Sequence, residues 1–180
     1  MDLGPPPLFS LINLKRKAHF RNSKQVMHIK NCSHLLIWRG KLLFRFNDGK
    51  PFPYLINQRT KFIKKLTTYI FLGEFENKNV FLWDMSDSRD VLGNTGQIGS
   101  FNDADRNYHP DLPKGTYFCD LRNLLPVLNS KYANLCATAK GMYEWHKRVN
   151  FCQSCGGKLS SEKAGWEKTC IKCNFKQFPR

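Results

Sequence analysis

The sequence is short of acidic side chains. Its 180 residues include 14 Asp and Glu against 29 Lys and Arg, which gives a net charge of +15. This imbalance excludes a typical neutral cytosolic domain and favours a polyanionic partner, namely nucleic acid, an acidic membrane surface or an acidic subunit. Residues 1–70 carry 14 basic and 2 acidic side chains, residues 71–120 carry 4 and 9, and residues 121–180 carry 11 and 3. The positive charge therefore lies in the two ends of the sequence.

Long hydrophobic runs are also missing. No apolar stretch approaches the roughly 18 residues that a membrane-spanning helix needs, so we expect no transmembrane segment. The first residues lack the apolar region of a secretory signal peptide. Residues 8–24 are basic and free of acids, which is typical of a mitochondrial transit segment. We favour the alternative, a basic arm over residues 1–33, because this segment shows no clear hydrophobic period.

The cysteine pattern does not indicate a disulfide framework. Seven cysteines, an odd number, and the missing secretory signal favour a reducing intracellular compartment, either the mitochondrial matrix or the cytoplasm. Four of the seven follow the spacing Cys152-x2-Cys155, fourteen residues, then Cys170-x2-Cys173. Two such pairs a dozen or so residues apart are typical of a four-cysteine zinc ribbon.

The residues after each cysteine pair support this prediction. Gly156 follows the first pair and Asn174 the second, and both residue types tolerate the left-handed backbone of a tight metal-binding turn. A redox CxxC motif would need only one pair in a thioredoxin-like context, and iron–sulfur sites normally show other spacings. We therefore predict one structural zinc ion per chain. All four positions are cysteines, so no coordination site stays open for catalysis.

Hydrophobic patterning predicts a β-rich first domain. Apolar runs at 35–38 and 41–46 flank a Gly-containing turn and predict one hairpin, and runs at 69–72 and 80–83 predict a second. These runs are almost wholly apolar, which predicts that both faces of the sheet are covered. Residues 47–60 and 86–114 are expected to be loops, because they are rich in turn-forming residues.

Helical patterning follows in the sequence. Leucines over 121–128 predict a short helix, and Ser130 is the expected N-cap of an amphipathic helix. Cys136 and His146 lie on its apolar face, where we expect a buried thiol and a histidine in or near the core. The predicted fold class is α+β, with a small antiparallel β-rich domain and a helical segment (34–128, with loop 86–114), a connecting helix (129–149) and a zinc ribbon (150–180).

Further motifs surround the cysteines, namely Trp145-His146, the run FCQSCGG at 151–157, Gly165-Trp166 and the closing Phe178-Pro179-Arg180. Together with the two CxxC pairs, they resemble the NADH pyrophosphatase family of Nudix hydrolases. Residues 69–73, 80–84 and 120–122 resemble the family's N-terminal domain more loosely. The resemblance implies a β-rich domain, a helix and a zinc ribbon, followed by a catalytic Nudix domain.

The residues that catalyse hydrolysis in that family are missing. The resemblance implies a Nudix box with an Arg-Glu-x-x-Glu-Glu run that holds magnesium, but this sequence has five Glu and no Arg-Glu or Glu-Glu dipeptide. The sequence ends where the family enters its catalytic domain. We therefore expect this chain to be inactive alone, and magnesium and NAD(H) to bind only where a Nudix domain is supplied elsewhere.

The resemblance also bears on three residues around the ribbon. Phe178 occupies the place of an aromatic that helps to bind the substrate's nucleobase, and packing against the ribbon is the alternative. Gly165 stands where some members have an acidic substrate contact, so that contact is not carried over. Trp166 is expected in the core of the ribbon.

Two hypotheses for function remain open. In the first, the chain is the zinc-ribbon scaffold part of an NADH pyrophosphatase-like protein, an NAD(H) diphosphatase that would also act on the NAD cap of RNA, and it contributes homodimerisation and part of the base pocket. In the second, it is a repurposed zinc-binding subunit that docks RNA or an acidic protein in a larger, mitochondrial assembly.

Overall fold

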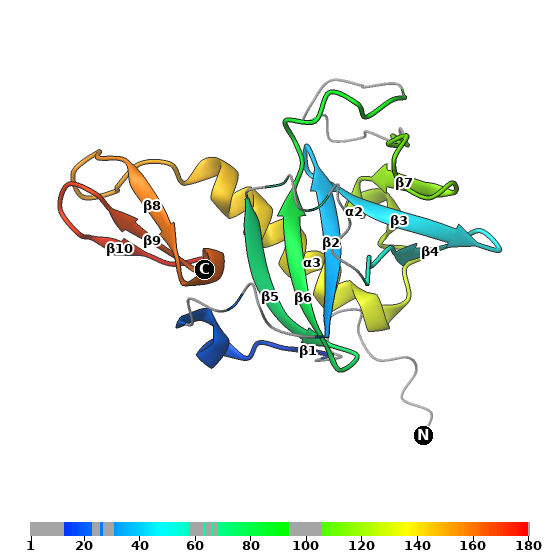
Figure 1. Cartoon of the computed structure of the whole chain (residues 1–180), viewed down its shortest axis with the longest axis horizontal. Helices are drawn as coiled ribbons and strands as arrows, with labels where there is room; N and C mark the ends of the chain where they lie inside the picture. Colours follow the sequence, from blue (N-terminus) through cyan, green and yellow to red (C-terminus); the bar gives the residue numbers. More distant parts are fainter. Residues whose placement is uncertain are drawn as a thin grey trace.

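The computed structural model describes residues 13–22, 26, 31–57, 63, 66, 68–93 and 106–179. They form a β-rich domain, a long helix and a small ribbon that stands as a separate lobe at the end of the helix (Figure 1). The predicted α+β class is confirmed. Within this part of the chain, no helix combines the length and the apolar character needed to cross a membrane.

A seven-stranded sheet forms the body of the larger domain. Its order is β1-β5-β6-β2-β3-β4, and β7 pairs with β3 outside this path. The bounds of the strands are β1 Leu14–Lys15, β2 Cys32–Trp38, β3 Lys41–Asn47, β4 Lys50–Pro53, β5 Tyr69–Phe75, β6 Lys78–Asp84 and β7 Thr116–Cys119. The two predicted hairpins, β2–β3 and β5–β6, are both present and antiparallel. They meet through a parallel β2–β6 ladder, so the sheet as a whole is mixed.

Two segments without a predicted strand contain one. Strand β4 lies inside 47–60 and pairs with β3, so the prediction of a continuous loop there was wrong. Pro51 and Pro53 are compatible with β4 because it is an edge strand, where a missing N–H group is tolerated. Strand β1 lies inside the segment predicted to be an arm, and its Leu14 is buried in the core. Residues 58–60, 1–12, 23–25 and 27–30 lie outside the described residues.

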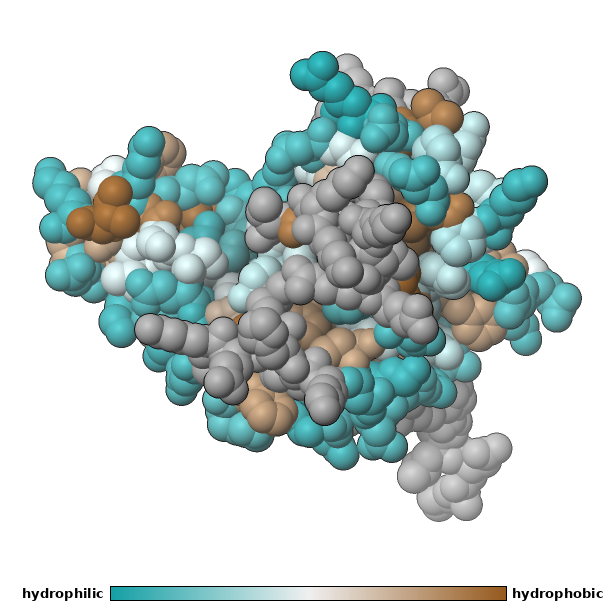
Figure 2. All heavy atoms as spheres, viewed as in Figure 1, coloured by the Kyte–Doolittle hydropathy of each residue, from teal (hydrophilic) through white to brown (hydrophobic). Residues whose placement is uncertain are grey.

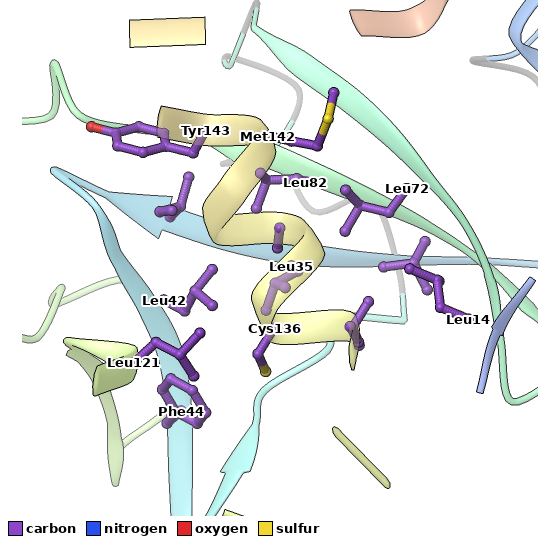
Figure 3. Packing of buried hydrophobic residues seen from close by; sticks show 14 of the residues in the cluster. Leu14, Leu35, Leu42, Phe44, Leu72, Leu82, Leu121, Cys136, Met142 and Tyr143 are labelled. Atoms are coloured by element: carbon purple, nitrogen blue, oxygen red, sulfur yellow. The ribbon is translucent and has the colours of Figure 1, made fainter. Parts of the chain in front are cut away.

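Both faces of the sheet are covered, as the apolar runs predicted. Helices α2 (Leu121–Leu124) and α3 (Ser130–Arg148) pack on one face, where Leu35, Leu42 and Leu82 of the sheet meet Cys136 and Met142 of α3 (Figure 3). The other face holds a second cluster with several aromatic side chains, among them Trp38, Phe71, Phe81, Trp83 and Phe118.

The N-cap of helix α3 lies one residue before its predicted position. Asn129, not the expected Ser130, is the N-cap, and its Oδ1 atom accepts a hydrogen bond from the Lys131 N–H group at 2.9 Å. The preceding helix is shorter than predicted, because α2 ends at Leu124. Within 86–114, the described residues form isolated bridges and turns rather than named strands, and residues 94–105 lie outside the described part.

The ribbon consists of β8 (Leu159–Glu162), η3 (Lys163–Gly165), β9 (Glu167–Cys170) and β10 (Lys176–Gln177). Its three strands pair in the order β10-β9-β8. The 3-10 turn η3 contacts β5 of the larger domain and the N-terminal 3-10 helix η1 (Ala18–Asn22). The blue η1 segment lies next to the ribbon in Figure 1.

Candidate metal centre and its attachment

The two CxxC turns bring four sulfur atoms together. The Sγ atoms of Cys152, Cys155, Cys170 and Cys173 all lie within 4.8 Å of one another. The Sγ–Sγ distance is 3.7 Å for Cys152–Cys173, 3.5 Å for Cys155–Cys170 and 3.3 Å for Cys155–Cys173. All seven cysteines of the chain are free thiols, so no disulfide holds this cluster.

These separations fit a small tetrahedral metal ion. Four sulfur atoms at about 2.3 Å from a central zinc ion would lie about 3.8 Å from one another. The three Sγ–Sγ distances given above lie at or slightly below this value. The four cysteines are therefore positioned to bind a metal ion, and the all-sulfur ligand set is consistent with zinc.

The two turns have the same backbone geometry. The Gly156 N–H group donates to the Cys152 carbonyl oxygen at 2.9 Å, and the Asn174 N–H group donates to the Cys170 carbonyl oxygen at 3.0 Å. Gly156 has a φ of 70° and Asn174 a φ of 59°, so the prediction of a left-handed backbone at both residues is confirmed. The left-handed backbone could be predicted from glycine and asparagine at these positions, because few other residue types tolerate this conformation.

Backbone donors also face the sulfur atoms. The Ser154 N–H group lies 3.4 Å from the Sγ atom of Cys152, and the Lys172 N–H group lies 3.4 Å from that of Cys170. Hydrogen bonds from the Cys173 and Lys172 N–H groups lower the pKa of the Cys170 thiol to about 6. Because a metal binds the thiolate, these donors favour the form of Cys170 that acts as a ligand.

The buried carboxylate of Glu167 connects three elements of the ribbon through ion pairs. The side chain of Glu167 is 1% exposed and forms ion pairs with Lys163 at 2.9 Å and Lys176 at 3.0 Å. Burial raises the pKa of this carboxyl group, but hydrogen bonds from the two lysines outweigh burial, and the net pKa is lowered. Glu167 therefore joins β9 to both η3 and β10 as a charged group.

The helix end and the ribbon are joined by polar contacts. The Nε2 atom of His146 lies 2.8 Å from the Gly165 carbonyl oxygen, and the Nζ atom of Lys168 donates to the carbonyl oxygens of His146 and Val149. Lys168 thus satisfies carbonyl groups at the C-terminus of α3, which have no partner within the helix. The prediction of a satisfied histidine in or near the core is confirmed for His146. Burial lowers its pKa.

Trp166 lies between the ribbon and the larger domain. Its Nε1 atom donates to the Phe71 carbonyl oxygen in β5, and its ring packs against the core cluster under α3. The expectation that Trp166 belongs to the ribbon's own core was therefore wrong, because its contacts cross to the sheet. Gly165 has a φ of 91°, and a Cβ atom there would lie 2.9 Å from Cγ1 of Ile70. The glycine lets the ribbon approach β5 closely.

Sequence reasoning missed two arginines at this contact. The guanidinium carbons of Arg16 and Arg21 lie 5.1 Å and 3.7 Å from the centroid of the Trp166 ring. No local pattern could have identified them, because 150 and 145 positions separate them from Trp166. The composition only indicated a basic segment.

Phe178 lines a cavity on another side of the ribbon. The cavity measures about 390 Å³ and is lined by Trp145, Val149, Gln153, Phe175, Lys176, Gln177 and Phe178. The side chain of Phe178 is 55% exposed, so it does not pack fully against the ribbon. The structure brings Phe178 beside a second exposed aromatic, Phe175, at the rim of the ribbon.

Known proteins match parts of this chain. The family model for the NADH pyrophosphatase-like rudimentary NUDIX domain matches residues 33–145. The human NAD-capped RNA hydrolase NUDT12 is 36% identical over 64 residues, which is 36% of this chain and 12% of that protein. The human NAD(P)H pyrophosphatase NUDT13, mitochondrial, is 30% identical over 88 residues, which is 47% of this chain and 25% of that protein.

The chain thus spans at most a quarter of the length of these relatives. The family model covers strands β2 to β7 and most of α3, and the cysteine cluster lies beyond it. The residues that resemble the NADH pyrophosphatase family lie both within the matched range 33–145 and after it. The matched region, which includes strands β2 to β7 of the central sheet, shows that the chain belongs to the NADH pyrophosphatase-like rudimentary NUDIX domain family.

Proposed function

We propose that the chain is the zinc-ribbon scaffold part of an NADH pyrophosphatase-like protein and that it does not hydrolyse dinucleotides on its own. The observation that carries this proposal is the cage of four thiols on a ribbon attached to a rudimentary NUDIX domain. A metal with four cysteine ligands has no open site for water, so its role is structural. The proposed metal is one zinc ion per chain.

The zinc ion is expected to supply most of the ribbon's folding free energy. The ribbon has little apolar core of its own, because Phe151, Ile171, Phe175 and Phe178 are all exposed. Hydrophobic side chains lie on the outer surface of this lobe in Figure 2. Small metal-binding modules of this kind are unfolded without their metal.

Elemental analysis tests the metal site. The purified chain should contain about one zinc ion, and Cys170→Ser should lose the metal and make residues 150–179 sensitive to protease. Cys32→Ser is the matched control, because Cys32 lies in β2 and not in the cage, so this variant should keep its zinc. A Cys170→Ser protein that retains zinc would contradict the four-cysteine site.

The absence of a Nudix box from the sequence supports the non-catalytic part of the proposal. The five Glu are spread along the chain, and none follows an arginine or another Glu. Purified chain incubated with NADH and magnesium should produce no nicotinamide mononucleotide. Turnover that survives repurification and scales with protein concentration would overturn this part of the proposal. Magnesium and NAD(H) binding would then require no further domain.

We also propose that Phe178 stacks on a nucleobase when a Nudix domain completes the pocket. Its exposed ring borders a cavity of about 390 Å³ beside Phe175 and Trp145, and base stacking on such rings is tolerant of sequence. Phe178→Ala should weaken binding of NAD(H) in a protein that carries both parts. Phe151→Ala is the control, since Phe151 is 63% exposed and does not line the cavity. Equal effects of both changes would contradict the stacking role.

The second candidate function is a zinc-binding subunit that docks RNA or an acidic protein in a mitochondrial assembly. The net charge of +15 favours it, and it is compatible with the mitochondrial location in the name of NUDT13 and the RNA substrate in that of NUDT12. Three experiments test this candidate. RNA mobility shifts at rising salt test RNA binding, and light scattering tests whether the chain forms a homodimer. Imaging of a tagged chain tests the mitochondrial location. Binding that stays constant between 50 and 200 mM salt would argue against phosphate contacts, which weaken steeply over roughly this range.

A further inference from the structure

A second cavity lies where the ribbon meets the N-terminal segment. It measures about 610 Å³ and is lined by Arg21, Asn22, Val26, Thr68, Tyr69, His146, Ser161, Glu162, Lys163, Ala164 and Gly165. The wall comes from η1, from the start of β5, from the end of α3 and from the β8–η3 turn of the ribbon. This cavity shares no residue with the one beside Phe178.

Arg21 is the most unusual group in this wall. Its Nε atom is buried and has no hydrogen-bond partner among the described residues, although buried polar atoms nearly always have one. Its terminal nitrogen donates to the Arg16 carbonyl oxygen at 3.4 Å. Its guanidinium carbon lies over the Trp166 ring, 3.7 Å from the ring centroid, and this cation–π contact fixes the position of the charge.

No acidic side chain in the described part of the chain pairs with Arg21 or Arg16. Both cations lie beside Trp166, whereas the neighbouring Lys15 and Lys17 both pair with Glu74. Burial and the charge of Arg16 lower the pKa of Arg21 to about 10. Two like charges held close together with no acid paired to either favour a nearby anion, and of the two arginines Arg21 lines the cavity.

The opposite wall supplies polar and apolar groups. Ser161 presents a hydroxyl group from an exposed position on β8, and Lys163 adds a cation whose charge is shared with Glu167. Glu162 also lines the cavity, and its carboxylate limits the number of negative charges that fit. Val26, Tyr69 and Ala164 contribute apolar or aromatic surface.

The backbone of the β8–η3 turn is strained where it faces the cavity. Lys163, Ala164 and Gly165 have φ angles of 48°, 52° and 91°, and the first two are not glycines. Non-glycine residues in this conformation cost free energy and persist where the surroundings hold them, often at ligand sites. Contacts of Gly165 with Ile70 and His146 hold this turn in place.

We propose that this cavity binds a nucleotide unit, with its phosphate on Arg21 and its base against the apolar wall. The Arg21 guanidinium has no acidic partner in the described part of the chain, which favours an oxyanion, and arginine suits phosphate because its donors form a planar fork. The volume lies in the usual range of ligand sites, which is about 300–1,000 Å³, and is larger than a free phosphate needs. The nucleotide is either free or one residue of an RNA chain. This site is additional to the proposed function and depends neither on zinc chemistry nor on Phe178.

Isothermal titration calorimetry on the zinc-loaded full chain tests the site. The probes are adenosine monophosphate, a 5′-phosphorylated oligoadenylate and inorganic phosphate, all titrated into a Phe178→Ala background, which removes the proposed stacking ring of the other cavity. Arg21→Gln should weaken binding of both nucleotide probes by about tenfold or more, the loss expected for one charge-assisted hydrogen bond. Tighter binding of the oligonucleotide assigns the site to RNA, and equal binding assigns it to the free nucleotide.

Two further variants keep the test decisive. Ser161→Trp should block the cavity without removing a cation, which covers the case in which Arg21→Gln disturbs the contact with Trp166. Lys172→Gln removes the same charge from an exposed position on the second CxxC turn and should bind like the parent. Zinc content is measured for every variant, so loss of the metal site is distinguished from loss of nucleotide binding. The proposal is overturned if no probe binds, if Ser161→Trp binds normally, or if Lys172→Gln is weakened as much as Arg21→Gln.

Discussion

The indole nitrogen of Trp166 donates a hydrogen bond to the carbonyl oxygen of Phe71, and this bond connects the ribbon to the central sheet. The β5–β6 register shifts between Phe71 and Gly73, so the ladder is irregular where the indole reaches β5. Arg21 covers the ring of the same tryptophan. One side chain therefore contacts the ribbon, the sheet and the N-terminal segment together.

Removing the indole N–H group should weaken this attachment. Trp166→Phe keeps an aromatic ring beside Arg21 but leaves the Phe71 carbonyl oxygen without this donor. The free energy of unfolding should fall by about 1 kcal/mol, as is typical for one hydrogen bond. Urea unfolding followed by circular dichroism measures the change. Ile171→Ala is the control, because Ile171 is 68% exposed on the ribbon, and an equal loss there would contradict a specific role for the indole.

Two glycines, Gly165 in the ribbon and Gly141 in helix α3, should change the stability with opposite signs when they are replaced with alanine. Gly165→Ala places a methyl group 2.9 Å from Ile70 at a φ of 91°, so we expect destabilisation of about 1–3 kcal/mol. Gly141 lies inside α3, and a Cβ atom there would meet nothing within 4 Å. Gly141→Ala should therefore stabilise the protein by about 0.5–1 kcal/mol. Thermal unfolding of both variants checks the two signs, and destabilisation by Gly141→Ala would show that the helix is not formed as described.

His146 should make the stability depend on pH. Burial lowers the pKa of His146 below its ordinary value of 6.5, so the unfolded chain binds a proton at a higher pH than the folded chain. The free energy of folding that depends on neutral His146 is therefore fully present above about pH 6.5. It is lost as the pH falls towards the pKa of His146 in the folded protein. The hydrogen bond between Nε2 and the Gly165 carbonyl oxygen opposes this shift, because it favours the protonated ring, but burial outweighs it.

Urea unfolding of the parent and His146→Gln between pH 7.5 and 5 measures this effect. The parent should lose more stability than the variant across this range. Both proteins keep the same four cysteines, so loss of metal at low pH affects them alike, and the difference between the curves isolates the histidine. Parallel curves would mean that His146 has the same pKa in the folded and unfolded states.

Local features of the sequence predicted local features of the structure. The CxxC spacing and the residues Gly156 and Asn174 identify the cage, because each turn depends on nearby residues with few alternatives. The apolar runs identify the two hairpins for the same reason. Strand β4 was missed because Pro51 and Pro53 usually indicate a loop, and only the position of a strand at a sheet edge makes them acceptable.

Contacts between distant segments could not be predicted in this way. Trp166 looked like a ribbon residue, but its partners Phe71 and Arg21 are 95 and 145 positions away. Leu14 is a further example, because strand β1 is only two residues long and shows no period. These contacts depend on the three-dimensional arrangement of the sheet, which a single sequence does not reveal.

The N-terminal segment should contribute to stability, although its sequence resembles a transit segment. Leu14 is 1% exposed and packs in the cluster beneath α3, and strand β1 passes so close to Gly73 that a Cβ atom there would lie 2.3 Å from the Lys15 carbonyl oxygen. Leu14→Ala should cost about 2–5 kcal/mol, whereas Lys15→Ala, whose side chain is 70% exposed, should cost under 1 kcal/mol. Deletion of residues 1–24 should lower the unfolding temperature more than deletion of residues 1–12, because only the longer deletion removes Leu14, Arg16 and Arg21. Equal unfolding temperatures for the two deletions would show that this segment does not stabilise the fold.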